Sequence, residues 1–148
     1  MTELQEFIAK LERLNVMEVA VETINETSKE FLDLNRDQLH KGKKSTGGGI
    51  GHYASLEYAQ MKSAMNSEAG FGNVDLILTG SFNQKMEMSA SGDTFKIDSA
   101  DEKSTSLQLW YGTDVFGLHP ENQKGYNFTV FLPLFLRKIQ KRTGIVPN

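Results

Sequence analysis

The chain contains no cysteine and only three histidines in 148 residues. Without cysteine it can form no disulfide, bind no metal through thiolates and use no cysteine nucleophile. The three histidines, His40, His52 and His119, show none of the HxH, HxxxH or HExxH spacings that bring two imidazoles to one metal ion. We therefore predict no metal site, and we interpret the histidines as solvated or capping residues.

Long apolar runs and an excess of positive charge are also lacking. No segment approaches the roughly 20 apolar residues of a membrane span. Glu3 and Glu6 precede any basic cluster, which is unlike the start of a secretory signal peptide. The formal net charge of −3 provides no overall attraction to nucleic acid or anionic lipid. We expect an intracellular, soluble protein that has no membrane partner.

The composition that remains is that of a folded domain. Hydrophobic residues make up 39% of the chain and charged residues 24%, which is typical of globular proteins rather than disordered ones. A chain of this length can bury one core but is too short for two ordinary domains. We predict a single α+β domain over residues 1–148. Its expected parts are a helical part (1–41), a short strand and helix (50–65), an antiparallel sheet (74–112) and a C-terminal helical part (119–142).

Two amphipathic helices are predicted in the N-terminal part. Apolar residues recur at helical spacing over residues 4–14 and again over residues 17–39, so the second helix is expected to be the longer. Its far side is acidic and includes Glu22, Glu26 and Glu30. A solvated face is the favoured interpretation, and docking of a basic partner is the alternative.

A lysine- and glycine-rich run follows these helices. Lys43 and Lys44 lie where cations complement the negative end of a helix dipole. Residues 47–51 contain four glycines, Gly48 among them, which predicts a flexible loop or a point of close contact. Phosphate binding by residues 41–51 is an alternative, although the order of strand, glycine loop, Lys-Ser/Thr and helix found in a P-loop is absent.

The sheet is expected to open with residues 73–82, the most strand-like run of the chain. Val74, Leu76 and Leu78 alternate with other residues and would share one face of a strand. Within residues 50–65, Ser55 is expected to cap a short helix that turns some of its apolar residues inward.

Shorter alternating segments continue the predicted sheet. Residues 86–90 and 95–97 flank Gly92, whose tolerance of positive φ suits a tight hairpin turn. Residues 107–111 are predicted to form a later strand with Trp110 on its reverse face, where it would serve core packing or a subunit contact. We therefore predict a small antiparallel sheet of three to five strands.

The C-terminal part reads as a strongly apolar helix that begins near Pro120. Gly125 argues against one smooth helix, and Pro133 is expected to kink or restart it. Cations are concentrated in its last turns. The favoured interpretation is that they complement the helix dipole, and DNA contact is the alternative. These cations include Arg137, Lys138 and Lys141. We predict that this helix packs on the sheet.

No set of side chains is spaced for catalysis. Ser81 has no Gly-x-Ser-x-Gly frame and no obvious histidine partner. Asp93, Asp98 and Asp101 follow no EF-hand order and are interpreted as turn residues. We therefore predict a protein that is not an enzyme, with no catalytic residue and no cofactor.

Three short motifs carry a resemblance to a known family. They are Thr79-Gly80-Ser81-Phe82, Tyr111-Gly112-Thr113 and Leu132-Pro133-Leu134, in this order after an acidic helical part. With them the sequence resembles the small tail-completion or head–tail joining (neck) proteins of long-tailed phages and prophages. The resemblance implies a non-enzymatic virion component, present in the host cytoplasm before assembly. Its copies would form a ring between the portal or its adaptor and the tail tube or its terminator.

A ring subunit needs two different faces that pair head to tail. The candidate contacts outside the helices are Lys43, Lys44, Gly48 and Trp110. We also hypothesise that acidic residues of the second helix face cations of the last helix of a neighbouring copy: Glu22, Glu26 and Glu30 against Arg137, Lys138 or Lys141. The alternative is a small ligand- or phosphate-binding protein, or an enzyme, that uses residues 41–51.

Overall fold

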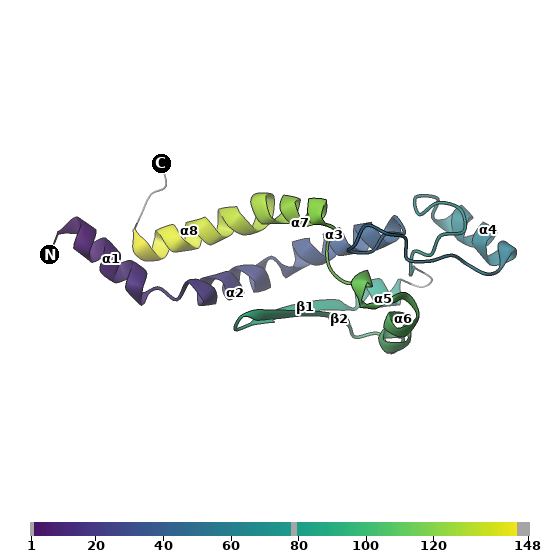
Figure 1. The fold of residues 1–148 in the computed structure, drawn as a ribbon, viewed down its shortest axis with the longest axis horizontal. Helices are drawn as coiled ribbons and strands as arrows, with labels where there is room; N and C mark the ends of the chain where they lie inside the picture. The colour runs from purple at the N-terminus through teal and green to yellow at the C-terminus, as the bar shows by residue number, and fades with distance from the viewer. Residues whose placement is uncertain (1, 78–79, 145–148) are drawn as a thin grey trace.

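A computed structural model describes residues 2–77 and 80–144. The molecule is elongated: α1, α2 and α3 follow one another along its length, α7 and α8 return beside them, and a β-hairpin lies along the other side (Figure 1). α4 lies at the end opposite α1 (Figure 1). The structure is therefore of the α+β class that the sequence predicts, with a larger share of helix.

The N-terminal part consists of three helices: α1 (Glu3–Arg13), α2 (Val16–Glu26) and α3 (Ser28–His40). Thr2 and Gln5 form a capping box at the start of α1, as helix N-termini require. The single longer helix predicted over residues 17–39 is interrupted at Thr27, so that prediction is wrong. The Thr27 hydroxyl donates a hydrogen bond to the Thr23 carbonyl at 2.7 Å, a side-chain bond that commonly bends helices.

The short helix predicted within residues 50–65 is present as α4 (Leu56–Met65), and Ser55 accepts a hydrogen bond from the Tyr58 N–H as its cap. The face of this helix that is buried differs from the expected apolar face. α4 turns Ala59 and Lys62 into the protein and leaves its larger apolar residues exposed. These exposed residues are Leu56, Met61 and Met65.

The predicted hairpin is confirmed. β1 (Met86–Ser91) pairs antiparallel with β2 (Thr94–Ser99), with Met86 opposite Ser99 and Ser91 opposite Thr94. Gly92 supplies the positive φ of the turn, +60°. Within residues 2–77 and 80–144 these two strands form the whole sheet, fewer than the three to five strands predicted.

Two predicted strands have other structures. Leu76 has a φ of +59°, which no continuing strand allows, and the Asp75 carboxylate accepts a hydrogen bond from the Ile77 N–H in a local turn. The chain then starts the short helix α5 (Ser81–Gln84) at Gly80. Leu78 and Thr79, which the predicted strand included, lie outside the described residues. The expected strand over residues 107–111 is instead the end of helix α6 (Ser104–Tyr111).

The C-terminal part is one continuous helical segment. α7 (Pro120–Tyr126) leads through a π-helical turn (Asn127–Phe131) into α8 (Leu132–Thr143), which ends at Gly144 with a φ of +74°. Gly125 does not break the helix, contrary to expectation. The irregular part of this segment is the π-helical turn, which lies directly before Pro133. Proline has no N–H, so the carbonyl four residues earlier lacks its usual donor.

α8 packs against α1 and α2. The expected packing of the C-terminal helix on the sheet is therefore wrong for α8, because its apolar side is taken up by the N-terminal helices. The hairpin is reached by the other end of the segment, where Tyr126 of α7 joins Phe31 and Leu118 in a small cluster that Met88 and Ile97 of the hairpin contact.

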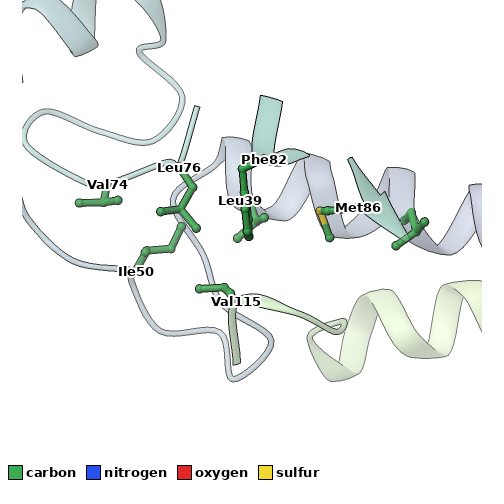
Figure 2. Packing of buried hydrophobic residues seen from close by; sticks show 8 residues of the cluster. Leu39, Ile50, Val74, Leu76, Phe82, Met86 and Val115 are labelled. Atoms are coloured by element: carbon green, nitrogen blue, oxygen red, sulfur yellow. The ribbon is translucent and has the colours of Figure 1, made fainter. Parts of the chain in front are cut away.

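The main core lies where loops cross α3 and the base of the hairpin. Figure 2 shows that its side chains come from α3, β1, α5 and several loop segments. The members are Leu32, Leu39, Ile50, Val74, Leu76, Phe82, Met86 and Val115. Val115 belongs to the 3₁₀ turn Thr113–Val115. Because loops supply half of this core, the position of each loop depends on the side chains that it buries.

Candidate functional site

A buried ion pair between α4 and the segment before α5 is the most unusual polar feature of the structure. The Lys62 Nζ lies 2.8 Å from the Asp75 Oδ1, and their side chains are only 4% and 2% exposed. Lys62 also donates to the Ile77 carbonyl. Asp75 accepts further hydrogen bonds from the Tyr53 hydroxyl at 3.3 Å and the Asn66 amide at 2.9 Å. The sequence did not predict this cluster, because Lys62 and Asp75 are 13 positions apart and neither belongs to a recognisable motif.

The electrostatics of the cluster favour a fixed ion pair over a proton-transfer group. Burial raises the pKa of Asp75, but the hydrogen bonds from Lys62, the Ile77 N–H and Asn66 outweigh it and hold the pKa below its usual range. Burial raises the pKa of Tyr53, and the neighbouring Asp75 charge raises it further. Asp75 is thus a weak base and Tyr53 a weak acid at neutral pH. The cluster can brace two loops against α4.

A cavity of about 390 Å³ opens beside this pair. Its walls come from α4, α5, α6 and the loops between them, and combine aromatic rings with charged groups. The residues with reactive or polar ends include Tyr58, Lys62, Ser81, Lys85, Asp101 and Trp110. Of the described residues that line this cavity, none is a histidine.

The Ser81 and Asp101 side chains meet within this cavity. The Ser81 hydroxyl donates a hydrogen bond to the Asp101 carboxylate, and the Lys85 Nζ lies 3.9 Å from the same oxygen. Hydrogen bonds from Ser81 and from the Lys103 N–H lower the pKa of Asp101. A carboxylate with a lowered pKa is a poor base for activating a serine, which normally requires a histidine or a lysine. The arrangement therefore favours a structural role for Ser81, in closing a turn, over a role as a nucleophile.

The glycine-rich run is held by hydrogen bonds within the chain. Lys44 N–H donates to the Gly48 carbonyl at 2.8 Å, and Lys43 and Gly49 form an isolated antiparallel bridge. Gly47 has a φ of +86°, and a Cβ there would lie 2.7 Å from the His119 ring. This is the close-contact role that the sequence offered as one alternative. In this run, the N–H groups of Lys44, Gly47 and Ile50 donate to carbonyl oxygens of the same run, and that of Ser45 donates to the Asp114 carbonyl. These groups are therefore not turned toward a phosphate.

Three of the predicted interface charges, Glu22, Glu26 and Lys138, lie beside one another in a single chain. Lys138 pairs with Glu26 at 2.8 Å and with Glu22 at 3.6 Å, and Arg142 pairs with Glu22 at 2.6 Å. The hydrogen bond from Arg142 is the main cause of the lowered pKa of Glu22, and the bond to Glu26 raises the pKa of Lys138. These contacts hold α8 to α2, so the hypothesised contacts of Glu22 and Glu26 with a neighbour have intrachain competitors.

The other predicted interface residues are dispersed over the surface. Glu30, Arg137 and Lys141 are exposed, and no ion pair of theirs occurs among the residues that the structure describes. Lys43 and Gly48 are exposed as well, whereas the Lys44 Nζ lies 3.3 Å from the Asp114 carboxylate. Trp110 is 71% exposed, on a helix rather than a strand. The three histidines lie apart, and the described residues contain no cluster of His, Asp and Glu suited to a metal ion.

Large apolar side chains are left uncovered on several elements, with α1, α4 and α6 among them. On α1, Leu4, Ile8 and Leu11 are 64%, 44% and 38% exposed; we call these three residues the α1 stripe. On α6, Leu109 and Trp110 are 82% and 71% exposed; we call them the α6 knob. The sequence predicted an amphipathic helix here, and no residue of α1 is buried.

The total exposed surface is also large. The chain exposes 9403 Å², whereas a compact monomer of 16.6 kDa exposes about 7,600 Å². The difference of about 1,800 Å² agrees with the elongated shape of the molecule (Figure 1).

Comparisons with known proteins found no match to this chain. No family model matches the chain, and no curated protein and no solved structure is significantly similar to it. In the described part of the chain, none of the helices has the length and apolarity needed to cross a membrane.

Proposed function

We propose that this chain is a structural virion subunit of the tail-completion or neck type, whose copies join in a ring between the portal or its adaptor and the tail tube. The observation that carries the proposal is the number of large apolar side chains left uncovered, among them the α1 stripe and the α6 knob. Apolar patches rimmed by polar residues are typical of protein–protein contacts. The short motifs that resemble neck proteins point to the same class.

The absence of a catalytic role is part of this proposal. The polar groups beside the cavity have pKa directions unsuited to chemistry at neutral pH: Asp75 and Asp101 are held ionised, and Tyr53 is held protonated. Their hydrogen bonds join loops to helices, which gives the subunit a rigid frame. Rigidity suits a ring component because the angle between neighbouring copies sets how many close the ring.

The test is a null mutant of the phage or prophage that encodes the chain, examined by electron microscopy. We expect filled heads and separate tails that fail to join, with joining restored when the chain is supplied from a plasmid. Complete, infectious particles in the null mutant would contradict the proposal.

The alternative, phosphate or nucleotide binding by residues 41–51, has less support. The Lys44, Gly47 and Ile50 N–H groups donate to carbonyls of the same turn, at 2.8, 2.9 and 3.1 Å. A phosphate would have to replace these bonds, with only exposed cations such as Lys43 to hold it. Isothermal titration with ATP and with inorganic phosphate tests this alternative, and we expect no heat of binding.

A further inference from the structure

The cavity of about 390 Å³ lies between α4, α5 and α6, at the end of the molecule opposite α1 (Figure 1). Its volume is in the range of pockets that hold one small molecule. Lys62 belongs to its wall and is only 4% exposed. A lysine ammonium has three N–H donors, and the Asp75 carboxylate and the Ile77 carbonyl accept two of those of Lys62. One donor of a buried cation therefore remains for an acceptor inside the cavity.

The backbone of the cavity wall is strained at Leu76. This residue lines the cavity and has a φ of +59°, and among residues 2–77 and 80–144 it is the sole residue other than glycine with a positive φ. Conformations of this kind persist where the surrounding structure enforces them, and they are concentrated at ligand and active sites. The hydrogen bond from the Ile77 N–H to the Asp75 carboxylate, at 2.9 Å, closes the turn around Leu76. The fold therefore holds this part of the wall and the buried ion pair in one arrangement.

The charges around the cavity balance one another. Each of the three lysines in the wall has a carboxylate close to it in space or next to it in the chain: Lys62 with Asp75, Lys85 with Asp101, and Lys103 with Glu102. An anionic ligand is bound where cations are in excess, and a quaternary ammonium ion where aromatic rings and carboxylates line a site without cations. The described wall has neither excess. It therefore favours an uncharged ligand that carries many hydrogen-bonding groups.

The side chains of the wall narrow the class of ligand further. Four aromatic side chains line the cavity: Tyr53, Tyr58, Trp110 and Tyr111. Trp110 is 71% exposed, so its ring is open to the flat face of a ligand. The polar ends in the wall are ammonium, carboxylate and hydroxyl groups, and the described lining residues include no Asn or Gln, whose amides pair with the edges of nucleobases. An uncharged ring with apolar C–H groups on its faces and hydroxyl groups around its edge is a sugar.

We propose that this cavity binds an uncharged sugar ring. One face of the ring stacks on Trp110, one hydroxyl oxygen accepts a hydrogen bond from Lys62, and another hydroxyl donates to the Asp101 carboxylate. Asp101 has room for this bond, because a carboxylate offers about four acceptor positions and the Ser81 hydroxyl and the Lys103 N–H use two of them. The site is additional to the proposed role in the virion and does not depend on it.

Trp110 is the only tryptophan of the chain, so its fluorescence reports on this site directly. The full-length chain is titrated with glucose, galactose and N-acetylglucosamine at millimolar concentrations, and at least one of them is expected to change the emission of Trp110 saturably. Calorimetry then compares variants with the wild type. Trp110→Ala should bind that sugar at least about tenfold more weakly, and Trp110→Phe, which keeps a flat ring, should bind it more tightly than Trp110→Ala. Leu109→Ala is the matched control, because Leu109 is 82% exposed next to Trp110 but does not line the cavity.

Three results would overturn the proposal. The first is that none of the three sugars changes the emission of Trp110 saturably. The second is that Trp110→Ala and Leu109→Ala bind the sugar with equal affinity. The third is that adenosine, inorganic phosphate or choline, titrated in the same way, binds more tightly than every sugar, which would show that the class of ligand is wrong. None of these results bears on the proposed function, which the null mutant tests separately by the joining of heads to tails.

Discussion

Replacing Lys62 by methionine tests how much the buried ion pair contributes to the fold. Lys62→Met keeps the length of the side chain, so little cavity is created, but it leaves the Asp75 carboxylate 2% exposed without its cation. Breaking a buried pair in this way costs about 3–5 kcal/mol. The Asn66 amide, the Tyr53 hydroxyl and the Ile77 N–H still bond the carboxylate, so we expect the lower end, about 3 kcal/mol.

The same substitution elsewhere in the chain provides a matched control. Lys41 also lies 2.8 Å from a carboxylate, that of Asp37, but both side chains are 54% exposed. Lys41→Met should therefore cost no more than about 0.5 kcal/mol, the value of a surface pair one helical turn apart. The two variants differ mainly in burial, so their comparison isolates its effect.

Urea unfolding followed by circular dichroism measures both variants. With a slope near 2 kcal/mol per molar urea, a loss of about 3 kcal/mol lowers the unfolding midpoint by roughly 1.5 M. Lys41→Met should shift the midpoint by less than about 0.3 M. Equal, small shifts for both variants would refute the view that the buried pair organises this end of the molecule.

Three further predictions follow from the same geometry. Because the pKa of Asp75 is lowered in the folded state, its contribution to stability is present above the unfolded value of about 3.9 and is lost as pH falls through the folded value. Asp75→Asn should weaken the loss of unfolding free energy that the wild type shows as the pH falls below about 4. An unchanged pH dependence would contradict this prediction. Gly47→Ala should lower the free energy of unfolding in urea by about 1–2 kcal/mol, because Gly47 has a positive φ and the added Cβ would meet the His119 ring. Gly48→Ala should leave the free energy of unfolding nearly unchanged. Equal losses for the two variants would contradict this prediction. Lys138→Ala should cost less than about 1 kcal/mol, with the loss shrinking at high salt, because its nearer partner, Glu26, is 54% exposed. A loss that does not depend on salt would contradict this prediction.

The segments predicted well from sequence are those whose local signals agree. The hairpin has alternation on both strands and a glycine at the turn, and α4 has both a cap at Ser55 and helical propensity. The start of α7 at Pro120 follows the preference of proline for the first turn. In each case the chain needs no distant contact to choose its conformation.

The segments predicted wrongly are those where tertiary contacts decide. Leu107 and Tyr111 are compatible with period two, but they are also one helical turn apart, and the helix forms with Leu109 exposed. The segment around Val74 is apolar because it enters the core as a loop, and the positive φ of Leu76 cannot be seen in a hydropathy pattern. Alternation alone could not separate these cases.

The candidate site was the least predictable part. Lys62 and Asp75 are 13 positions apart and carry ordinary surface side chains, so nothing in the sequence indicates that they are buried together. Conversely, the α1 stripe has the ideal pattern of a core helix, and the structure leaves it uncovered. A pattern of apolar residues shows that a face will be covered, but it does not show whether the same chain or another copy covers it.

We propose that the chain is an assembled part of a phage particle, and counting its copies in purified particles tests this proposal. Quantitative mass spectrometry against an isotope-labelled standard gives this number per particle. We predict a fixed number of several copies per particle, as a ring requires, that persists after repeated purification at high salt. Infectious particles that contain no copy of the chain would contradict the account.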